Sequence, residues 1–291
     1  MTAENKTRAS LGRLFAQTFQ SLKGGWLSPS SSASSSGDGS SDPEAAFAGG
    51  LRRAKQRHVF SGAACLIAVG DIHGRADLLE RLFHKIDRMT EEARATEIYL
   101  GDYVDRGADS RRVIALLLDR RQSGKDLVLL RGNHETMFLR ALEDDASLLA
   151  WLNYGGLATL TSYGVNAENA FRDPASVRAA LNDAMPQQHK DFLQNLPLFY
   201  RDGEFLFVHA GIRPNVPLDH QTETDLTTIR EPFLSSSEDF GFVVVHGHTP
   251  GEYPVLRDNR IGLDTGAFHT SRLTAIKLGP TGLDLITALP N

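Results

Sequence analysis

The amino-acid sequence predicts an α/β fold in which one folded domain follows a tail. Three apolar runs, 64-ACLIAVG-70, 96-TEIYLG-101 and 126-DLVLLRG-132, are typical of buried strands. The segments between them, 76–93 and 109–122, have the apolar spacing of amphipathic helices. Strands and helices therefore alternate, which is the pattern of a sheet whose strands are joined by crossover helices.

The rest of the domain continues this mixture of helices and strands. Residues 134–196 are predicted to be predominantly helical. Two strand-like runs follow, 204-EFLFVHAG-211 and 241-GFVVVHGH-248. The C-terminal part predicts further strands at 260–266, 272–279 and 282–289. Because the sequence shows no repeat at a fixed period, residues 61–291 are expected to form one domain.

The composition is that of an ordinary globular protein, and it limits the classes of function. Of 291 residues, 41% are hydrophobic and 23% are charged, which is usual for a soluble domain. The net charge of −5 provides no overall basic field, so nucleic acid is not expected as a partner. The single cysteine, Cys65, cannot form an intramolecular disulfide and is expected to be a buried residue of a strand.

Residues 1–60 differ from the domain and are expected to form a largely disordered tail. The segment 27-LSPSSSASSSGDGSSDP-43 is too rich in serine and glycine to bury much apolar surface, so it is interpreted as a flexible linker. Within residues 10–26, leucine, phenylalanine and tryptophan recur at helical spacing, which predicts a short amphipathic helix. Such a helix either docks on a membrane surface or a partner protein, or packs on its own domain.

The sequence also gives an expectation for the compartment. It has no uninterrupted apolar stretch of membrane-spanning length. It begins with polar 1-MTAENKTRAS-10, where a signal peptide would have a basic segment and an apolar core. We therefore expect a cytoplasmic protein, which residues 10–26 could attach peripherally to a membrane.

Small polar clusters follow five of the predicted strands, where sheets of this kind assemble their sites. Taken singly, each residue has a plain structural explanation, such as a helix cap or a solvated histidine. Taken together, they offer oxygen and nitrogen ligands without a thiolate, which suits cations such as manganese, iron or zinc. Asp102, in the middle strand, is the natural bridge between two such cations. The clusters are Asp71 and His73, Asp102 and Asp105, Asn133 and His134, His209, and His248.

These clusters form motifs that resemble those of a known family. In chain order they are 70-GDIHG-74, 101-GDYVDRG-107, 131-RGNHE-135, 208-VHAG-211 and 246-HGHT-249. They resemble the motifs of the metal-dependent phosphoprotein phosphatases, the serine/threonine phosphatases within the calcineurin-like metallophosphoesterases. The resemblance covers most of the folded part and implies a central β-sandwich of mixed sheets flanked by helices.

The resemblance further implies two divalent metal ions, with manganese preferred and iron or zinc as alternatives. It selects His248 as a ligand in place of the neighbouring His246, which is then expected to be structural. Carried over by motif position, the ligands of one ion are Asp71, His73 and Asp102, and those of the other are Asp102, Asn133, His209 and His248.

The acid and phosphate-binding residues follow from the same resemblance. His134, paired with Asp105, would protonate the leaving group. Arg106 would bind phosphate oxygens, for which a planar and permanently charged fork is suited. Arg230 resembles the second phosphate-binding arginine of bacterial members, and Arg213 is the competing candidate.

The expected function is hydrolysis of phosphomonoesters, most closely that of a serine/threonine protein phosphatase acting on a phosphorylated protein. A hydroxide bridging the two cations would attack phosphorus in line, and the His134–Asp105 pair would protonate the departing alkoxide. Arg131 and Glu135 of the RGNHE motif are assigned to packing and charge balance.

Three other hypotheses stay open. One is a hydrolase of diadenosine polyphosphates or of another small phosphoester or phosphoanhydride, because pocket walls decide the substrate. A second, from another class, is a phosphoprotein-binding scaffold that retains the phosphatase fold without catalysis. In the third, residues 10–26 tether the domain and its location directs its activity.

Overall fold

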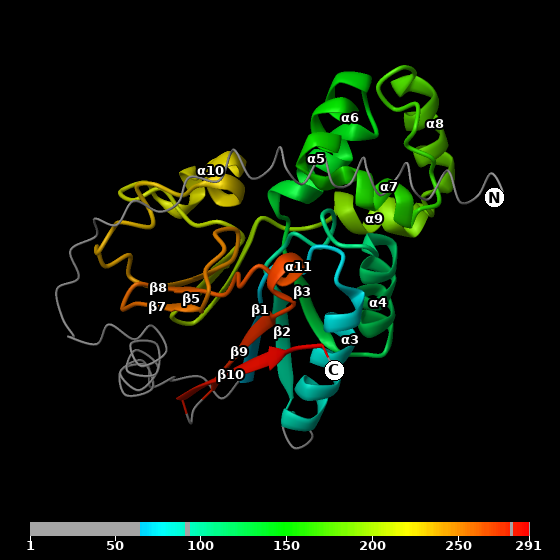
Figure 1. Cartoon of the computed structure of the whole chain (residues 1–291). Helices are drawn as coiled ribbons and strands as arrows, with labels where there is room; N and C mark the ends of the chain where they lie inside the picture. The colour runs from blue at the N-terminus through cyan, green and yellow to red at the C-terminus, as the bar shows by residue number, and fades with distance from the viewer. Residues whose placement is uncertain (1–64, 91–93, 280–281, 291) are drawn as a thin grey trace. The chain divides into compact units, whose positions relative to one another are not determined.

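A computed structural model describes residues 65–90, 94–279 and 282–290 of the chain (Figure 1). The helix predicted over 10–26 and the linker predicted over 27–43 lie outside the described residues. Within the described residues, none of the helices is long and apolar enough to cross a membrane.

The first sheet combines strands from both ends of the domain. Three parallel strands, β1 (Cys65–Val69), β2 (Ala95–Tyr99) and β3 (Asp126–Leu129), match the apolar runs predicted first. The C-terminal strands β9 (Leu273–Gly279) and β10 (Gly282–Ala288) join antiparallel beside β1. The strand order is β10-β9-β1-β2-β3, so β1 lies in the middle of the sheet.

Two crossover helices connect the parallel strands, as predicted. They are α3 (Ala76–Met89) and α4 (Ser110–Gln122), which lie beside the first sheet in Figure 1. Asp109 accepts a hydrogen bond from the backbone N–H of Arg112 at 3.1 Å and so caps the start of α4.

Strand β1 shows why its sequence is apolar at every position. Cys65, Ile67 and Val69 belong to the core that β1 shares with the helices. Leu66 and Ala68 belong to a second core, which is shared with the other sheet. Because successive side chains of a strand point to opposite faces, a strand covered on both faces needs an unbroken apolar run.

The second sheet has the order β4-β5-β6-β8-β7. Its central strands β5 (Phe205–Val208), β6 (Val243–His246) and β8 (Arg260–Gly262) are parallel and were expected from their apolar runs. Its edge strands β4 (Phe199–Asp202) and β7 (Val255–Leu256) pair antiparallel with their neighbours and were not predicted.

The two mixed sheets pack on each other through an apolar core, which confirms the predicted β-sandwich. Phe205 and Phe207 of β5 join side chains of the first sheet in this core. Leu206 and Val208 point the other way and pack with Leu226 of helix α10 (Glu223–Thr228). Helices therefore flank the sandwich on both outer faces.

The stretch between β3 and β4 is helical, as predicted. Asp144 caps α6 and Asp173 caps α8, each by accepting a hydrogen bond from the N–H three residues on. The helices α6, η1 and α7 follow one another without a loop, and η1 is a π-helix. The elements are α5 (Asn133–Ala141), α6 (Asp145–Trp151), η1 (Leu152–Gly156), α7 (Leu157–Ser162), α8 (Pro174–Ala184) and α9 (Gln187–Gln194).

Candidate active site

The polar clusters predicted at five strand ends lie together in the structure. They follow β1, β2 and β3 of the first sheet and β5 and β6 of the second. Several of their residues have a left-handed backbone, which costs on the order of 1–3 kcal/mol for a residue other than glycine. Such conformations persist only where the surroundings hold them, and they are common at functional sites. The site residues concerned are His73, Asp102, Asp105, Arg106 and His248.

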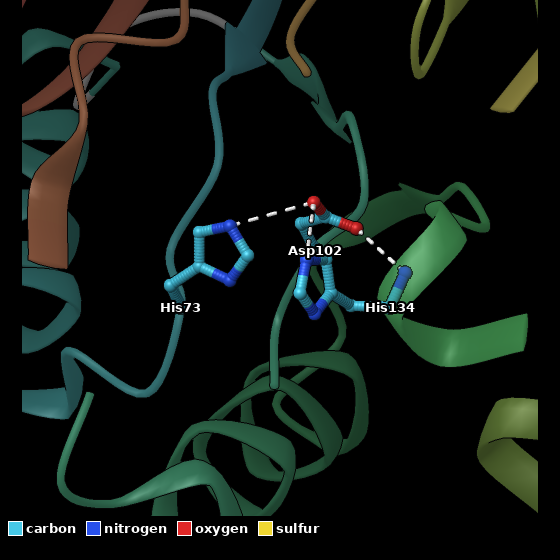
Figure 2. A group of neighbouring side chains, drawn as sticks. All are labelled: His73, Asp102 and His134. Atoms are coloured by element: carbon cyan, nitrogen blue, oxygen red, sulfur yellow. Dashed lines mark hydrogen bonds and ion pairs between the residues drawn. The ribbon is translucent and has the colours of Figure 1, made fainter. Parts of the chain in front are cut away.

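Two histidines are oriented toward the carboxylate of Asp102. The Nδ1 atom of His73 lies 2.8 Å from the carbonyl oxygen of Val104, and that of His209 lies 2.8 Å from the carbonyl oxygen of Leu100. Their Nε2 atoms each lie 3.4 Å from an oxygen of Asp102, as Figure 2 shows for His73. Metal-binding histidines are usually held in this way, with the second ring nitrogen on a carbonyl.

Asn133 and His248 complete this side of the site. The amide oxygen of Asn133 lies 3.1 Å from His209 Nε2 and 3.0 Å from His248 Nδ1. The backbone N–H of His248 donates to both oxygens of Asp71 at 3.1 Å. The Nε2 atom of His248 is buried and has no hydrogen-bond partner among the described residues.

The donor atoms form two groups that fit divalent cations. One group contains Asp102, His209 and His248, and the other contains His73, Asp102 and His134, each with ligand atoms within 4.8 Å of one another. Asp102 is common to both groups, as expected for a bridging carboxylate. Nitrogen and carboxylate oxygen donors of this kind suit zinc, iron and manganese.

Buried negative charge strengthens the case for cations. Asp71 and Asp102 are almost fully buried, and so is Asp264, which follows β8. Burial and the neighbouring Asp264 raise the pKa of Asp71 well above its usual range. Burial also raises the pKa of Asp264 to about 6. Carboxylates confined in this way need positive charge nearby in order to stay ionised.

The buried charges of the site also shift the pKa values of its histidines. Burial lowers the pKa of His209, but the charge of Asp102 outweighs it and raises that pKa to about 10. Burial lowers the pKa of His248 to about 3, and the charges of His209 and Arg230 contribute to this shift. A proton on His209 therefore partly neutralises the site, and cation binding would displace it.

The predicted acid pair is formed by direct contact. His134 Nδ1 lies 2.7 Å from Asp105 Oδ2, and both side chains are buried. On the other side of the ring, His134 Nε2 lies 3.0 Å from a guanidinium nitrogen of Arg106. Arg106 also reaches His73 Nε2 at 2.9 Å, so its fork spans the two imidazoles. A phosphate oxygen bound by Arg106 would thus lie close to the Nε2 atom of His134.

Glu135, which the sequence analysis assigned to packing and charge balance, binds the backbone of a loop in the site. Its carboxylate accepts hydrogen bonds from the backbone N–H groups of Asp102, Tyr103, Val104 and Gly132, at 2.7 to 3.3 Å. Burial and the charge of Asp102 raise the pKa of Glu135 to about 7. Glu135 therefore fixes the backbone of the loop that carries Asp102.

The two candidates for the second phosphate-binding arginine have different surroundings. Arg213 forms an ion pair with Asp225, with Nη2 and Oδ1 2.5 Å apart. Arg230 is exposed and close enough to His248 for its charge to act on that imidazole. Arg213 is thus engaged in an ion pair, whereas the charge of Arg230 acts on one of the predicted ligands.

Four other described histidines, for which a packing or surface position was expected, belong to neither ligand group. His246 is buried and packs edge-on against the ring of Phe233, with centroids 5.1 Å apart. His189 is buried beside the hydroxyl of Tyr163, and His84 and His220 are exposed. His58 lies outside the described residues.

Sequence reasoning missed two residues that touch the acid pair. Trp151 Nε1 donates to Asp105 Oδ2 at 2.8 Å, and the hydroxyl of Thr159 donates to Asp105 Oδ1 at 2.7 Å. Both lie in the segment 151-WLNYGGLAT-159, which reads as an ordinary helix. Its adjacent glycines were the available signal, because glycine weakens a helix interior.

Comparison with known families gives one match over most of the chain. A family model described as calcineurin-like phosphoesterase matches residues 66–284, which include every predicted site residue.

Individual relatives are more distant. A Caenorhabditis elegans protein described as a candidate serine/threonine-protein phosphatase is 39% identical over 83 residues, 28% of this chain and 22% of that protein. A second serine/threonine-protein phosphatase of C. elegans is 26% identical over 172 residues, 58% of this chain and 31% of that protein. The chain thus aligns with less than a third of the length of these curated relatives.

A solved structure shows the same fold. It is described as a candidate diadenosine tetraphosphatase and aligns with a TM-score of 0.57 and 22% sequence identity. The alignment covers 79% of this chain and 96% of that chain. At this identity the likeness shows the fold alone.

Proposed function

The chain belongs to the calcineurin-like phosphoesterase family, and from this premise we propose that it is a metal-dependent phosphomonoester hydrolase acting on phosphoserine and phosphothreonine in proteins. The observation that carries the proposal is the contact between His134 and Asp105 beside Arg106. An acid pair at a phosphate-binding arginine is what the removal of a poor leaving group requires.

We assign the metal-holding residues from the donor atoms described above. Two divalent cations, preferably manganese, would be held by the ligand sets predicted from the motifs, with Asp102 in both. Asp71 is in neither of the two donor groups and would join His73 and Asp102, whereas His134, which is in one of them, would serve as the acid. When bound, such cations activate water and offset the charge of a phosphoryl group. The buried Nε2 atom of His248, which has no partner in the part of the chain that the structure describes, supports this assignment. The carbonyl-anchored rings of His73 and His209 also support it.

The protein's own side chains would orient the phosphate and move the proton. The guanidinium of Arg106 offers parallel N–H donors to phosphate oxygens, and Arg230 would supply a second cationic contact. Asp105 holds His134 by its Nδ1 atom, and Nε2 faces the guanidinium of Arg106 at 3.0 Å. Once phosphate oxygens take the N–H donors of Arg106, Nε2 would carry the proton. As the bond to phosphorus breaks, His134 would deliver this proton to the departing oxygen.

The need for this proton depends on the leaving group, which provides a test. A serine or threonine alkoxide is strongly basic and needs protonation, whereas p-nitrophenolate leaves unaided. His134→Asn should therefore reduce turnover of a phosphoserine peptide by on the order of 10²–10⁴. Its effect on p-nitrophenyl phosphate should be much smaller. His220→Asn, at an exposed histidine that belongs to neither ligand group, is the matched control.

The substrate class is tested with a panel assayed in manganese. The panel contains phosphoserine, phosphothreonine and phosphotyrosine peptides, diadenosine tetraphosphate and small phosphate monoesters. Preference for the serine and threonine peptides supports the proposal, and preference for diadenosine tetraphosphate replaces it with phosphoanhydride hydrolysis. Phosphopeptide binding without turnover by the manganese-loaded protein would support a scaffold. If His134→Asn lost turnover equally on the phosphoserine peptide and on p-nitrophenyl phosphate, the role of His134 as the acid would be refuted.

The docking of residues 10–26 on a membrane or partner stays a prediction. Deleting residues 1–43 should leave turnover of a small substrate unchanged and shift the protein between the membrane and soluble fractions of the cell. Unchanged fractionation would contradict docking.

A further inference from the structure

The carboxylate of Asp105 is held on both oxygens by residues of the segment 151–159. Oδ2 accepts from His134 Nδ1 at 2.7 Å and from the indole Nε1 of Trp151 at 2.8 Å. Oδ1 accepts from the hydroxyl of Thr159 at 2.7 Å. All four side chains are at most 1% exposed. The orientation of this carboxylate is therefore fixed by the protein and not by solvent.

The hydroxyl of Thr159 has further partners that fix its donor direction. It accepts from the backbone N–H of Asp105 at 2.9 Å and lies 2.8 Å from the hydroxyl of Ser110. Ser110 Oγ accepts from the same N–H at 3.0 Å. Because a hydroxyl has one hydrogen to donate, Ser110 donates to Thr159 and Thr159 donates to Asp105. The result is a directed chain of hydrogen bonds that ends on Oδ1.

The same segment also supports the backbone of the phosphate-binding residue. Asp105 and Arg106 have φ values of 71° and 67°, and such left-handed residues need external support. The backbone N–H of Arg106 donates to the carbonyl oxygen of Gly155 at 3.2 Å. A Cβ atom at Gly155 would lie only 2.9 Å from Arg106 Cγ, so a side chain there would displace Arg106.

A kink within η1 lets one segment make all these contacts. Trp151 ends α6, Gly155 lies in η1 with φ 106°, and Thr159 lies in α7. The backbone of Gly155 is not helical, so two helices meet there at a kink, and glycine is a common site for such kinks. The indole of Trp151 also stacks on Phe138 of α5, with ring centroids 4.9 Å apart and an interplanar angle of 10°. It thus packs on the helix whose first turn carries His134.

We propose that Trp151 and Thr159 are positioning residues for the proton transfer: they fix the carboxylate of Asp105 and, through it, the direction of His134 Nε2. This inference rests on the proposed function, because it concerns the acid step of that reaction. With Thr159 unable to donate, the carboxylate is held only through Oδ2 and can rotate about its Cβ–Cγ bond. A displacement of about 1 Å at a catalytic group can reduce the rate on the order of 10²-fold.

Thr159→Val is the most direct test, because valine keeps the branched shape and removes the hydroxyl. Thr159→Ser keeps a hydroxyl and is the rescue variant. Thr161→Val is the matched control, because it makes the threonine-to-valine change at an exposed position, where the hydroxyl donates to the carbonyl oxygen of Leu157. Thr159→Val should lower turnover of a phosphoserine peptide about tenfold or more and that of p-nitrophenyl phosphate less than about twofold. Thr159→Ser should recover most of the loss, and Thr161→Val should match the wild type.

The outcomes separate this inference from the function on which it rests. If Thr159→Val changes both substrates equally, or neither, the positioning role is overturned. If the wild-type protein hydrolyses no phosphomonoester, the proposed function fails first.

A proton NMR measurement then decides the position of the ring without turnover. The Nδ1–H signal of His134 is identified by its loss in His134→Gln. It should shift in Thr159→Val and in Trp151→Phe but not in Thr161→Val, and an unshifted signal in both site variants overturns the inference.

Discussion

Replacing Glu135 by glutamine changes a single atom and tests how the loop at the centre of the site is held. Glu135 Oε2 accepts from the N–H groups of Asp102 and Gly132 at 2.8 and 2.9 Å. Oε1 accepts from those of Tyr103 and Val104 at 2.7 and 3.3 Å. The carboxylate thus serves two backbone donors with each oxygen, and it is fully buried.

The expected loss of stability follows from the two backbone donors on each carboxylate oxygen. Whichever way the amide of glutamine turns, its NH₂ group faces two N–H donors that then have no acceptor. A buried donor left without a partner costs about 1–3 kcal/mol, so Glu135→Gln should destabilise the protein by about 2–6 kcal/mol. Native domains are stable by only about 5–15 kcal/mol, so the loss should be large. Turnover should also fall, because the loop carries Asp102.

Urea unfolding in the presence of a chelator measures the change without a contribution from metal binding. Glu143→Gln is the control, since Glu143 lies just beyond the same helix and is exposed. That control should stay within about 0.5 kcal/mol of the wild type. A Glu135→Gln protein of wild-type stability and turnover would refute the account of the loop.

Three further predictions concern other parts of the structure. Arg230→Ala should lower kcat/KM for a phosphopeptide about ten- to hundredfold through loss of a charged hydrogen bond. Arg213→Ala should change kcat/KM little. A larger loss in Arg213→Ala than in Arg230→Ala would make Arg213 the second phosphate-binding arginine. Arg120→Leu removes the bidentate partner of buried Glu97, with bonds of 2.6 and 2.7 Å, and should cost about 3–5 kcal/mol in urea unfolding. Burial lowers the pKa of His189 below its ordinary 6.5, so the unfolded chain takes up a proton first on acidification and stability should fall below about pH 6.5. His189→Gln should lose less stability between pH 7.5 and 5.5, and an equal loss would contradict this origin.

Much of the fold could be predicted because its strands have a strong local signal. Leu66 and Ile67 both face apolar cores on opposite sides of β1, so the sequence had to be apolar throughout. The edge strands Phe199–Asp202 and Val255–Leu256 have no such requirement, because their side chains are exposed or only partly buried. Their sequences are short and mixed in polarity. They become strands because they pair with segments elsewhere in the chain, and such pairing leaves no apolar pattern in the local sequence.

The same distinction applies to the site. Asp71 and Asn133 follow apolar strands within a few residues, and their motifs point to the carboxyl ends of a sheet. The ligand atoms alone do not distinguish His134 from a metal ligand, since it groups with His73 and Asp102. Trp151 lies far along the chain from Asp105, and a tryptophan in a helix is usually a core residue. Its contact with the acid pair arises from tertiary packing, which the local sequence does not encode.

The most direct test of the central claim is metal content measured together with turnover. After incubation with manganese and dialysis, the wild-type chain should retain two ions and Asp102→Asn should lose affinity for both, with turnover falling in parallel. Asp183→Asn, at an exposed position, should behave as the wild type. Two tightly held ions in Asp102→Asn, or a wild-type chain whose phosphatase activity survives complete removal of metal, would contradict a metal centre shared through Asp102.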